Sequence, residues 1–154
     1  MLLELPQDIR SAHAEMLFPR EKPIGIISPI KNGVLIYGVN GNLVGQSFLV
    51  GKNTMRISIG DGGSVDVKKE GQTVTVCSSP LENALKKNDT NFFVFGDPDA
   101  LQYKLFIKKP GVIEPVEVGL VAKHIFYPTV YYKINDSEEN LFRILLILLS
   151  INLL

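Results

Sequence analysis

The chain has 154 residues, the size of one common domain, and its 16 basic and 16 acidic side chains cancel. A chain without net charge has no general attraction for nucleic acid or an anionic membrane, so an anion site has to be local. The single cysteine excludes an internal disulfide, and the opening MLLELPQ is too short and too acidic for an export signal, so we expect a cytoplasmic protein.

Residues 1–23 show only weak helical periodicity, and whether this segment is ordered stays open. From Ile24 onward short apolar runs alternate with turn residues, which is typical of an antiparallel β domain. Asn32-Gly33 and Asn40-Gly41 are turn signals that tolerate positive φ, and apolar residues flank both of them. We therefore expect two early hairpins at the start of a single domain over residues 24–154.

The middle of the chain continues as a meander. Residues 60–63 link a strand over Met55–Ile59 to one over Ser64–Lys68, and Glu70-Gly71 links that strand to Thr73–Val76. A polar connector follows over residues 80–91. A second β run is then expected over Phe92–Gly96, Tyr103–Ile107, Val116–Val121 and His124–Ile134.

The last segment, Leu141–Leu154, is apolar on every side and is interrupted only by Arg143, Ser150 and Asn152. Such a helix has to be surrounded by protein or by lipid. Asp136 and Glu139 have the spacing of a capping box, which predicts a helix over about residues 137–154.

Lipid is the less favoured surrounding for this helix. Crossing a bilayer takes roughly 20 apolar residues, and this run is shorter and carries Arg143 near its start. We expect no membrane-spanning segment, so the β region has to enclose the helix. Replacing Leu146 or Leu149 with Asp is then expected to unfold the domain.

Three local patterns resemble those of one known family. Tyr37–Gly45 is similar to its early hairpin, Phe95–Pro98 followed by Tyr103–Leu105 to its middle strand pair, and Asn135–Asn140 to the entry of its last helix. Residues 24–154 thus resemble the tubby C-terminal-like superfamily, which includes LURP-one-related proteins and phospholipid scramblases. The resemblance implies a mainly β fold, a closed antiparallel β-barrel of about a dozen strands around a buried hydrophobic C-terminal helix.

The chain also departs from that family. Asn152 lies where the family helix often ends in an acidic residue, and the acylation cysteines of scramblases are absent, so scramblase activity is not expected. Asp136, Glu138 and Glu139 resemble the scramblases' calcium-binding segment, but they lack the alternating oxygens and turn glycine of an EF-hand. Helix capping explains these residues, and no metal site is expected.

Three lysine pairs are the candidate lipid site. Tubby domains hold phosphoinositide head groups on basic residues, and the resemblance implies an anion site here if folding gathers these pairs. The alternative is that they are solvated strand ends. The candidate residues are Lys68, Lys69, Lys86, Lys87, Lys108 and Lys109.

Catalytic patterns are missing from the sequence. His13 and His124 are the only histidines, and neither lies near a triad partner in sequence. Cys77 ends an alternating strand and is expected to be a small buried hydrophobe. The glycines of the early hairpin do not form a nucleotide-binding motif, so we expect no enzyme, no cofactor and no nucleic-acid partner.

The sequence favours a non-enzymatic binding module for phosphoinositide or other anionic lipid head groups, peripheral at a membrane surface. The alternative is a structural or scaffolding domain that acts through a protein partner or by oligomerising. An enzyme that works through Cys77 or His124 is the third and least favoured reading.

Overall fold

The computed structural model describes residues 1–11, 15–17, 22–60, 64–78, 91–108, 111–135 and 140–154. The first half of the chain forms β1 Leu2–Pro6, the 3-10 turn η1 Ile9–Ser11, β2 Glu15–Leu17, β3 Gly25–Ile30, β4 Gly33–Gly38, β5 Leu43–Gly51, β6 Thr54–Ile59 and β7 Ser64–Glu70. The second half forms β8 Thr73–Ser78, β9 Asn91–Asp97, β10 Gln102–Lys108, β11 Val116–Lys123, β12 Thr129–Ile134 and the helix α2 Leu141–Leu153.

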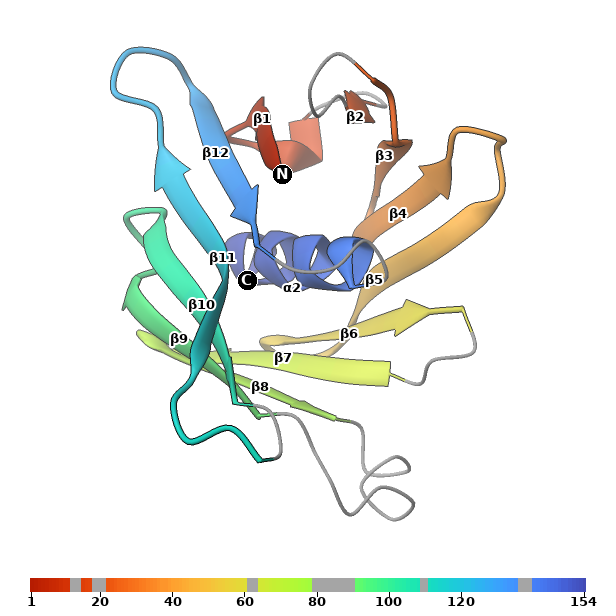
Figure 1. The fold of residues 1–154 in the computed structure, drawn as a ribbon. Coiled ribbons are helices and arrows are strands. Elements are labelled where there is room, and N and C mark those ends of the chain that lie inside the picture. The colour runs from red at the N-terminus through yellow and green to blue at the C-terminus, as the bar shows by residue number, and fades with distance from the viewer. Residues whose placement is uncertain (12–14, 18–21, 61–63, 79–90, 109–110, 136–139) are drawn as a thin grey trace.

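All twelve strands belong to one antiparallel sheet, a meander from β2 to β12 with β1 added beside β12. The sheet curls around α2, as Figure 1 shows. The predicted mainly β domain with one C-terminal helix is thus confirmed. Closure of the barrel is not, because β1 and β2 are the two edges and no ladder joins them within the described residues.

The N-terminal segment, whose order the sequence left open, contributes β1, η1 and β2. β1 pairs with β12 from Leu2↔Lys133 to Pro6↔Thr129, and the Met1 ammonium donates a hydrogen bond to the Ile134 carbonyl oxygen. η1 contacts β3, and Ile9 is buried. The chain therefore passes from one edge of the sheet to the other, with η1 between them (Figure 1).

The core lies between the inner face of the sheet and α2. Alternate residues of the strands point inward, as a strand's two-residue period requires, and most of them are Val, Ile or Leu. The helix is buried from Ile144 to Ile151. This explains why the C-terminal segment has no polar face.

Two glycines allow α2 to approach the sheet closely. A Cβ on Gly45 would lie 2.9 Å from Leu146 Cδ1, and one on Gly119 would lie 3.2 Å from Leu148 Cδ1. Side chains at these positions would force the leucine side chains of α2 to move, so the glycines leave room for the helix to pack against β5 and β11.

The early turns differ in one detail from the prediction. Gly41 has the expected positive φ of 87°, but the first turn consists of Lys31 and Asn32, and Gly33 already begins β4. Gly33 is required for another reason, since a Cβ there would lie 1.9 Å from the Ser47 carbonyl oxygen. The turn is thus held tightly against β5.

The helix begins at Leu141, and its N-cap Asn140 makes no side-chain capping bond. The predicted capping box of Asp136 and Glu139 lies outside the described residues, as does the remainder of that acidic segment. The described helix is therefore shorter at its start than the predicted range of about 137–154.

The polar residues of α2 are bonded to the surrounding sheet. The Ser150 hydroxyl lies 2.5 Å from the Ser47 hydroxyl and donates to the Leu146 carbonyl oxygen at 2.6 Å. Both serines are fully buried, so their hydroxyls would destabilise the fold if they had no hydrogen-bond partners. The pair supplies these partners.

Asn152 bonds to two strands at the end of the helix. Its Oδ1 accepts a hydrogen bond from the Tyr103 hydroxyl at 2.6 Å, and its Nδ2 donates to the Tyr132 hydroxyl oxygen at 2.6 Å. The Tyr103 hydroxyl also lies 3.1 Å from the Leu148 carbonyl oxygen. Burial raises the pKa of Tyr132 to about 12 and that of Tyr103 well above its usual value.

Candidate binding surface at one end of the sheet

The sheet presents one end at which α2 also terminates. Alternate turns of an antiparallel meander share an end, which places the turns 31–32, 52–53, 71–72, 98–101 and 124–128 together. η1 and the residues before it lie at the same end. The Arg10 guanidinium donates a hydrogen bond to the Leu153 carbonyl oxygen, and the backbone N–H of Gln7 donates to the Pro128 carbonyl oxygen. We call this end, formed by these five turns and η1, the C-terminal rim.

Of the predicted lipid-binding lysines, the described residues include Lys68, Lys69 and Lys108, whereas Lys86, Lys87 and Lys109 lie outside them. Lys68 and Lys69 lie at the C-terminal rim. Lys108 pairs in register with Asn91 at the opposite end of the sheet. The three described lysines are therefore not brought together.

The two lysines at the rim are already neutralised. Lys68 Nζ lies 2.9 Å from Glu70 Oε1, and this hydrogen bond with its charge raises the pKa of Lys68. Lys69 Nζ lies 2.6 Å from Asp99 Oδ1. Residues adjacent in a strand point to opposite faces, so Lys68 and Lys69 do not form one paired cationic site.

The turn from β11 to β12 carries the most exposed run of apolar side chains in the described chain. Ile125, Phe126 and Tyr127 are 88%, 84% and 64% exposed. The sequence predicted a β run over His124–Ile134, but the strand begins only at Thr129. The prediction was wrong over these residues because the alternation of apolar side chains does not distinguish a strand from an apolar turn.

The side chain of His124 fixes the conformation of this turn. Its Nδ1 accepts hydrogen bonds from the backbone N–H groups of Phe126 at 2.9 Å and Tyr127 at 3.2 Å. The Tyr127 and Tyr131 rings lie 4.8 and 5.3 Å from the His124 ring. The exposed apolar side chains are thus presented on a defined turn.

Four cations of the C-terminal rim have no acidic partner among the residues that the structure describes. Within the described residues, no carboxylate forms an ion pair with Arg10, Lys31, Lys52 or Lys123. They come from η1, the β3–β4 turn, the β5–β6 turn and the end of β11. The rim also carries the carboxylates of Asp8 and Asp97. It therefore combines exposed apolar groups with four cations that are not in ion pairs with described carboxylates, although the chain as a whole is neutral.

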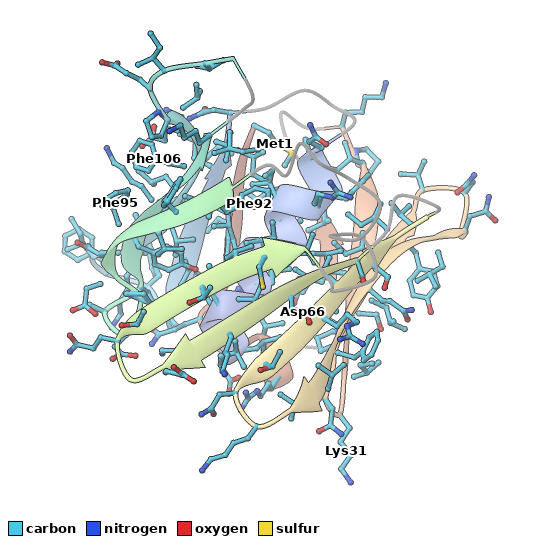
Figure 2. The ribbon with its side chains drawn as sticks, turned by 90° about the horizontal axis from the view of Figure 1, so that it is seen from below. Met1, Lys31, Asp66, Phe92, Phe95 and Phe106 are labelled. Atoms are coloured by element: carbon cyan, nitrogen blue, oxygen red, sulfur yellow. The ribbon has the colours of Figure 1, made fainter. Side chains whose placement is uncertain are left out.

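A second apolar surface lies on the outer face of β9 and β10. The rings of Phe95 and Phe106 meet edge to face with centroids 5.3 Å apart, and Phe93 is also exposed. Figure 2 shows Phe95 and Phe106 side by side at the edge of the molecule. We call these three residues the outer aromatic patch.

The residues considered for catalysis are not assembled. Cys77 was expected to be buried, but it is exposed on the outer face of β8, near the end of the sheet opposite the C-terminal rim. His124 lies at the rim, with β9 and β10 between the strands of the two residues. Burial and the charge of Asp66 raise the pKa of the Cys77 thiol, which lowers its thiolate fraction. His13 lies outside the described residues.

The described part of the chain contains no group of three or more His, Cys, Asp or Glu side chains arranged to hold a metal ion. It also contains no helix with the length and apolarity needed to cross a membrane. The acidic segment considered for calcium lies outside it.

No family model, curated protein or solved structure matches the chain. The resemblance to the tubby C-terminal-like superfamily therefore stays a prediction.

Proposed function

We propose that this chain is a non-enzymatic binding module that docks onto an anionic membrane surface with its C-terminal rim. The observation that carries the proposal is the β11–β12 turn, which exposes Ile125, Phe126 and Tyr127 in consecutive positions. Exposed aromatic and aliphatic side chains at the tip of a fixed turn suit the membrane interface. There an aromatic ring can contact acyl chains on one side and polar head groups or water on the other.

The charge of the rim supports an anionic surface rather than a neutral one. Arg10, Lys31, Lys52 and Lys123 surround the end of the sheet that carries this turn. Each basic residue close to an anionic leaflet contributes about 1 kcal/mol, and the effect falls off within a Debye length. Insertion of the turn and attraction of the rim would act together, so neither has to be strong alone.

The proposal keeps the lipid class that the resemblance implies but assigns it to other residues. Lys68 and Lys69 already have carboxylate partners, so the rim cations without partners carry the attraction. The curled sheet around α2 would supply a frame for the rim, with η1 packed against β3.

Co-sedimentation with vesicles tests this proposal. We expect binding to vesicles that contain phosphatidylserine, weaker binding as salt is raised, and little binding to phosphatidylcholine alone. Phe126→Ser removes a large apolar side chain from the turn and should weaken binding about tenfold or more. Phe95→Ser is the matched control, because Phe95 is 59% exposed but lies in the outer aromatic patch.

Absence of binding at low salt, or an equal loss in Phe126→Ser and Phe95→Ser, would contradict membrane docking. The alternative, a scaffold that acts through a protein partner, is favoured by one observation, the outer aromatic patch with its packed Phe95 and Phe106 rings. That function predicts the reverse pattern, with self-association or partner binding lost in Phe95→Ser and kept in Phe126→Ser.

A further inference from the structure

A pocket of about 240 Å³ opens at the C-terminal rim beside the end of α2. It lies between η1, the β3–β4 turn, the adjoining parts of β5 and β6, and the last residue of the helix. Its lining residues are Arg10, Ile30, Lys31, Asn32, Gly33, Leu49, Met55 and Leu153.

The lining has two chemically distinct parts. Ile30, Leu49, Met55 and Leu153 supply apolar walls, whereas Arg10 and Lys31 supply the only charged groups, and both are cationic. Figure 2 shows Lys31 projecting at the edge of the molecule. A pocket with these walls is complementary to a small molecule that has an apolar body and an anionic head.

Arg10 and Lys31 differ in how far neighbouring groups offset their positive charge. Arg10 donates one hydrogen bond to the Leu153 carbonyl oxygen, at the end of α2 that carries the negative pole of the helix dipole. Its charge is therefore partly offset by the helix. Lys31 has no ion-pair partner within the described residues, so it supplies most of the attraction for an anion.

The turn that carries Lys31 is held in place. The Leu49 amide donates a hydrogen bond to the Asn32 carbonyl oxygen at 2.8 Å, and Gly33 lies in close contact with the backbone of β5. The backbone that carries Lys31 is thus held beside the backbone of Leu49 before any ligand arrives, so binding need not order this turn.

The neighbouring pocket on the other side of Arg10 is a poorer site for an anion. It measures about 220 Å³ and includes Asp8, Asn152 and Leu154 in its lining. The carboxylate of Asp8 would repel an anionic head, so the two pockets are distinguished by charge although they share Arg10 and Leu153.

We infer that the pocket lined by Arg10 and Lys31 binds a carboxylate carried on a short apolar chain, with the carboxylate at Lys31 and Arg10 and the chain against Leu49, Met55 and Leu153. The size agrees with such a ligand, because sites for drug-sized molecules measure about 300–1,000 Å³ and this pocket is smaller. The site shares Arg10 and Lys31 with the proposed membrane-docking surface, but binding of a soluble carboxylate can be measured without a membrane.

Titration calorimetry with octanoate, octanol and acetate tests the inference without any membrane. Octanoate should bind one site per chain. Octanol lacks the charge and acetate lacks the chain, so each should bind at least about tenfold more weakly, since a buried methylene and a charge-assisted hydrogen bond each contribute to affinity.

Lys31→Gln should weaken octanoate binding about tenfold while Lys52→Gln, an exposed lysine of the next turn that does not line the pocket, leaves it unchanged. Both substitutions lie in exposed turns, and unchanged thermal melting verifies that the variants fold. The inference is overturned if octanoate shows no saturable binding, if octanol or acetate binds equally well, or if the two lysine variants behave alike.

Discussion

Asn152 is the residue that fixes the end of α2 within the sheet. Its amide bonds at once to Tyr103 on β10 and Tyr132 on β12, and both hydroxyls are in the buried part of the molecule. An amide can supply this bridge because it offers an acceptor and a donor from one side chain. The sequence identified Asn152 only as a departure from the acidic residue of a similar family.

Asn152→Ala should lower the free energy of unfolding by about 1–3 kcal/mol, because it removes the hydrogen bond to the buried Tyr132 hydroxyl and one of the two made by the Tyr103 hydroxyl. The loss should be smaller in a Tyr132→Phe background, where one of those hydroxyls is already gone. Urea denaturation of the four proteins of this double-mutant cycle measures the coupling, and strictly additive losses would contradict the bridge. Asn135→Ala, at an exposed residue, is the matched control.

The pKa of Tyr132 gives a prediction about pH. Since its folded-state pKa is raised from 10 to about 12, the unfolded chain loses this proton first. The stabilisation is therefore complete below about pH 10 and is lost as pH rises toward 12, at roughly 1.4 kcal/mol per unit. Urea denaturation at pH 9 and pH 11 measures how much the free energy of unfolding falls between the two pH values. This fall should be smaller for Tyr132→Phe than for the unsubstituted protein, and an equal fall would contradict the raised pKa of Tyr132.

At the scale of elements, the fold depends on the enclosure of α2. Eight consecutive residues, Ile144 to Ile151, are buried, and strands on several sides contact them. Leu146 also lies against Gly45 of β5, at a position with no side chain of its own. A charge placed here would have neither water nor a counter-ion.

Leu146→Asp should abolish the cooperative unfolding transition, because an unpaired buried charge costs several kcal/mol, comparable to the stability of a small domain. Leu43→Asp is the matched control, since Leu43 is exposed at the start of β5. Circular dichroism during heating distinguishes them. A Leu146→Asp protein that melts cooperatively near the temperature of the unsubstituted protein would be inconsistent with the enclosed helix.

The elements that could be predicted from sequence are those with a strong local pattern. The apolar segment from Leu141 identified the helix, and the turn residues around Gly41 and Gly71 identified the hairpins that the structure contains. The turn at Ile125–Tyr127 was missed because its apolar residues continue the adjoining strand pattern. The pocket was missed because Arg10, Lys31 and Leu153 are far apart in sequence and meet only after the sheet has curled.

At the scale of the whole molecule, charge and apolar surface are distributed unevenly over a neutral chain. The C-terminal rim gathers the exposed β11–β12 turn, the cations without partners and the pocket beside the helix end. No single segment of the sequence contains this combination, because the rim is formed by turns from the whole length of the chain. We propose this rim as the membrane-docking face of the protein.

The absence of tryptophan from the chain allows the most direct test of that claim. Phe126→Trp places a single fluorescent reporter on the exposed turn, and Phe95→Trp places one on the outer aromatic patch. On addition of phosphatidylserine vesicles, we expect a blue shift and protection from a soluble quencher for Trp at position 126 and neither change at position 95. A reporter at position 126 that stays in water while the protein is bound to vesicles, or one at position 95 that becomes protected instead, would contradict this proposal.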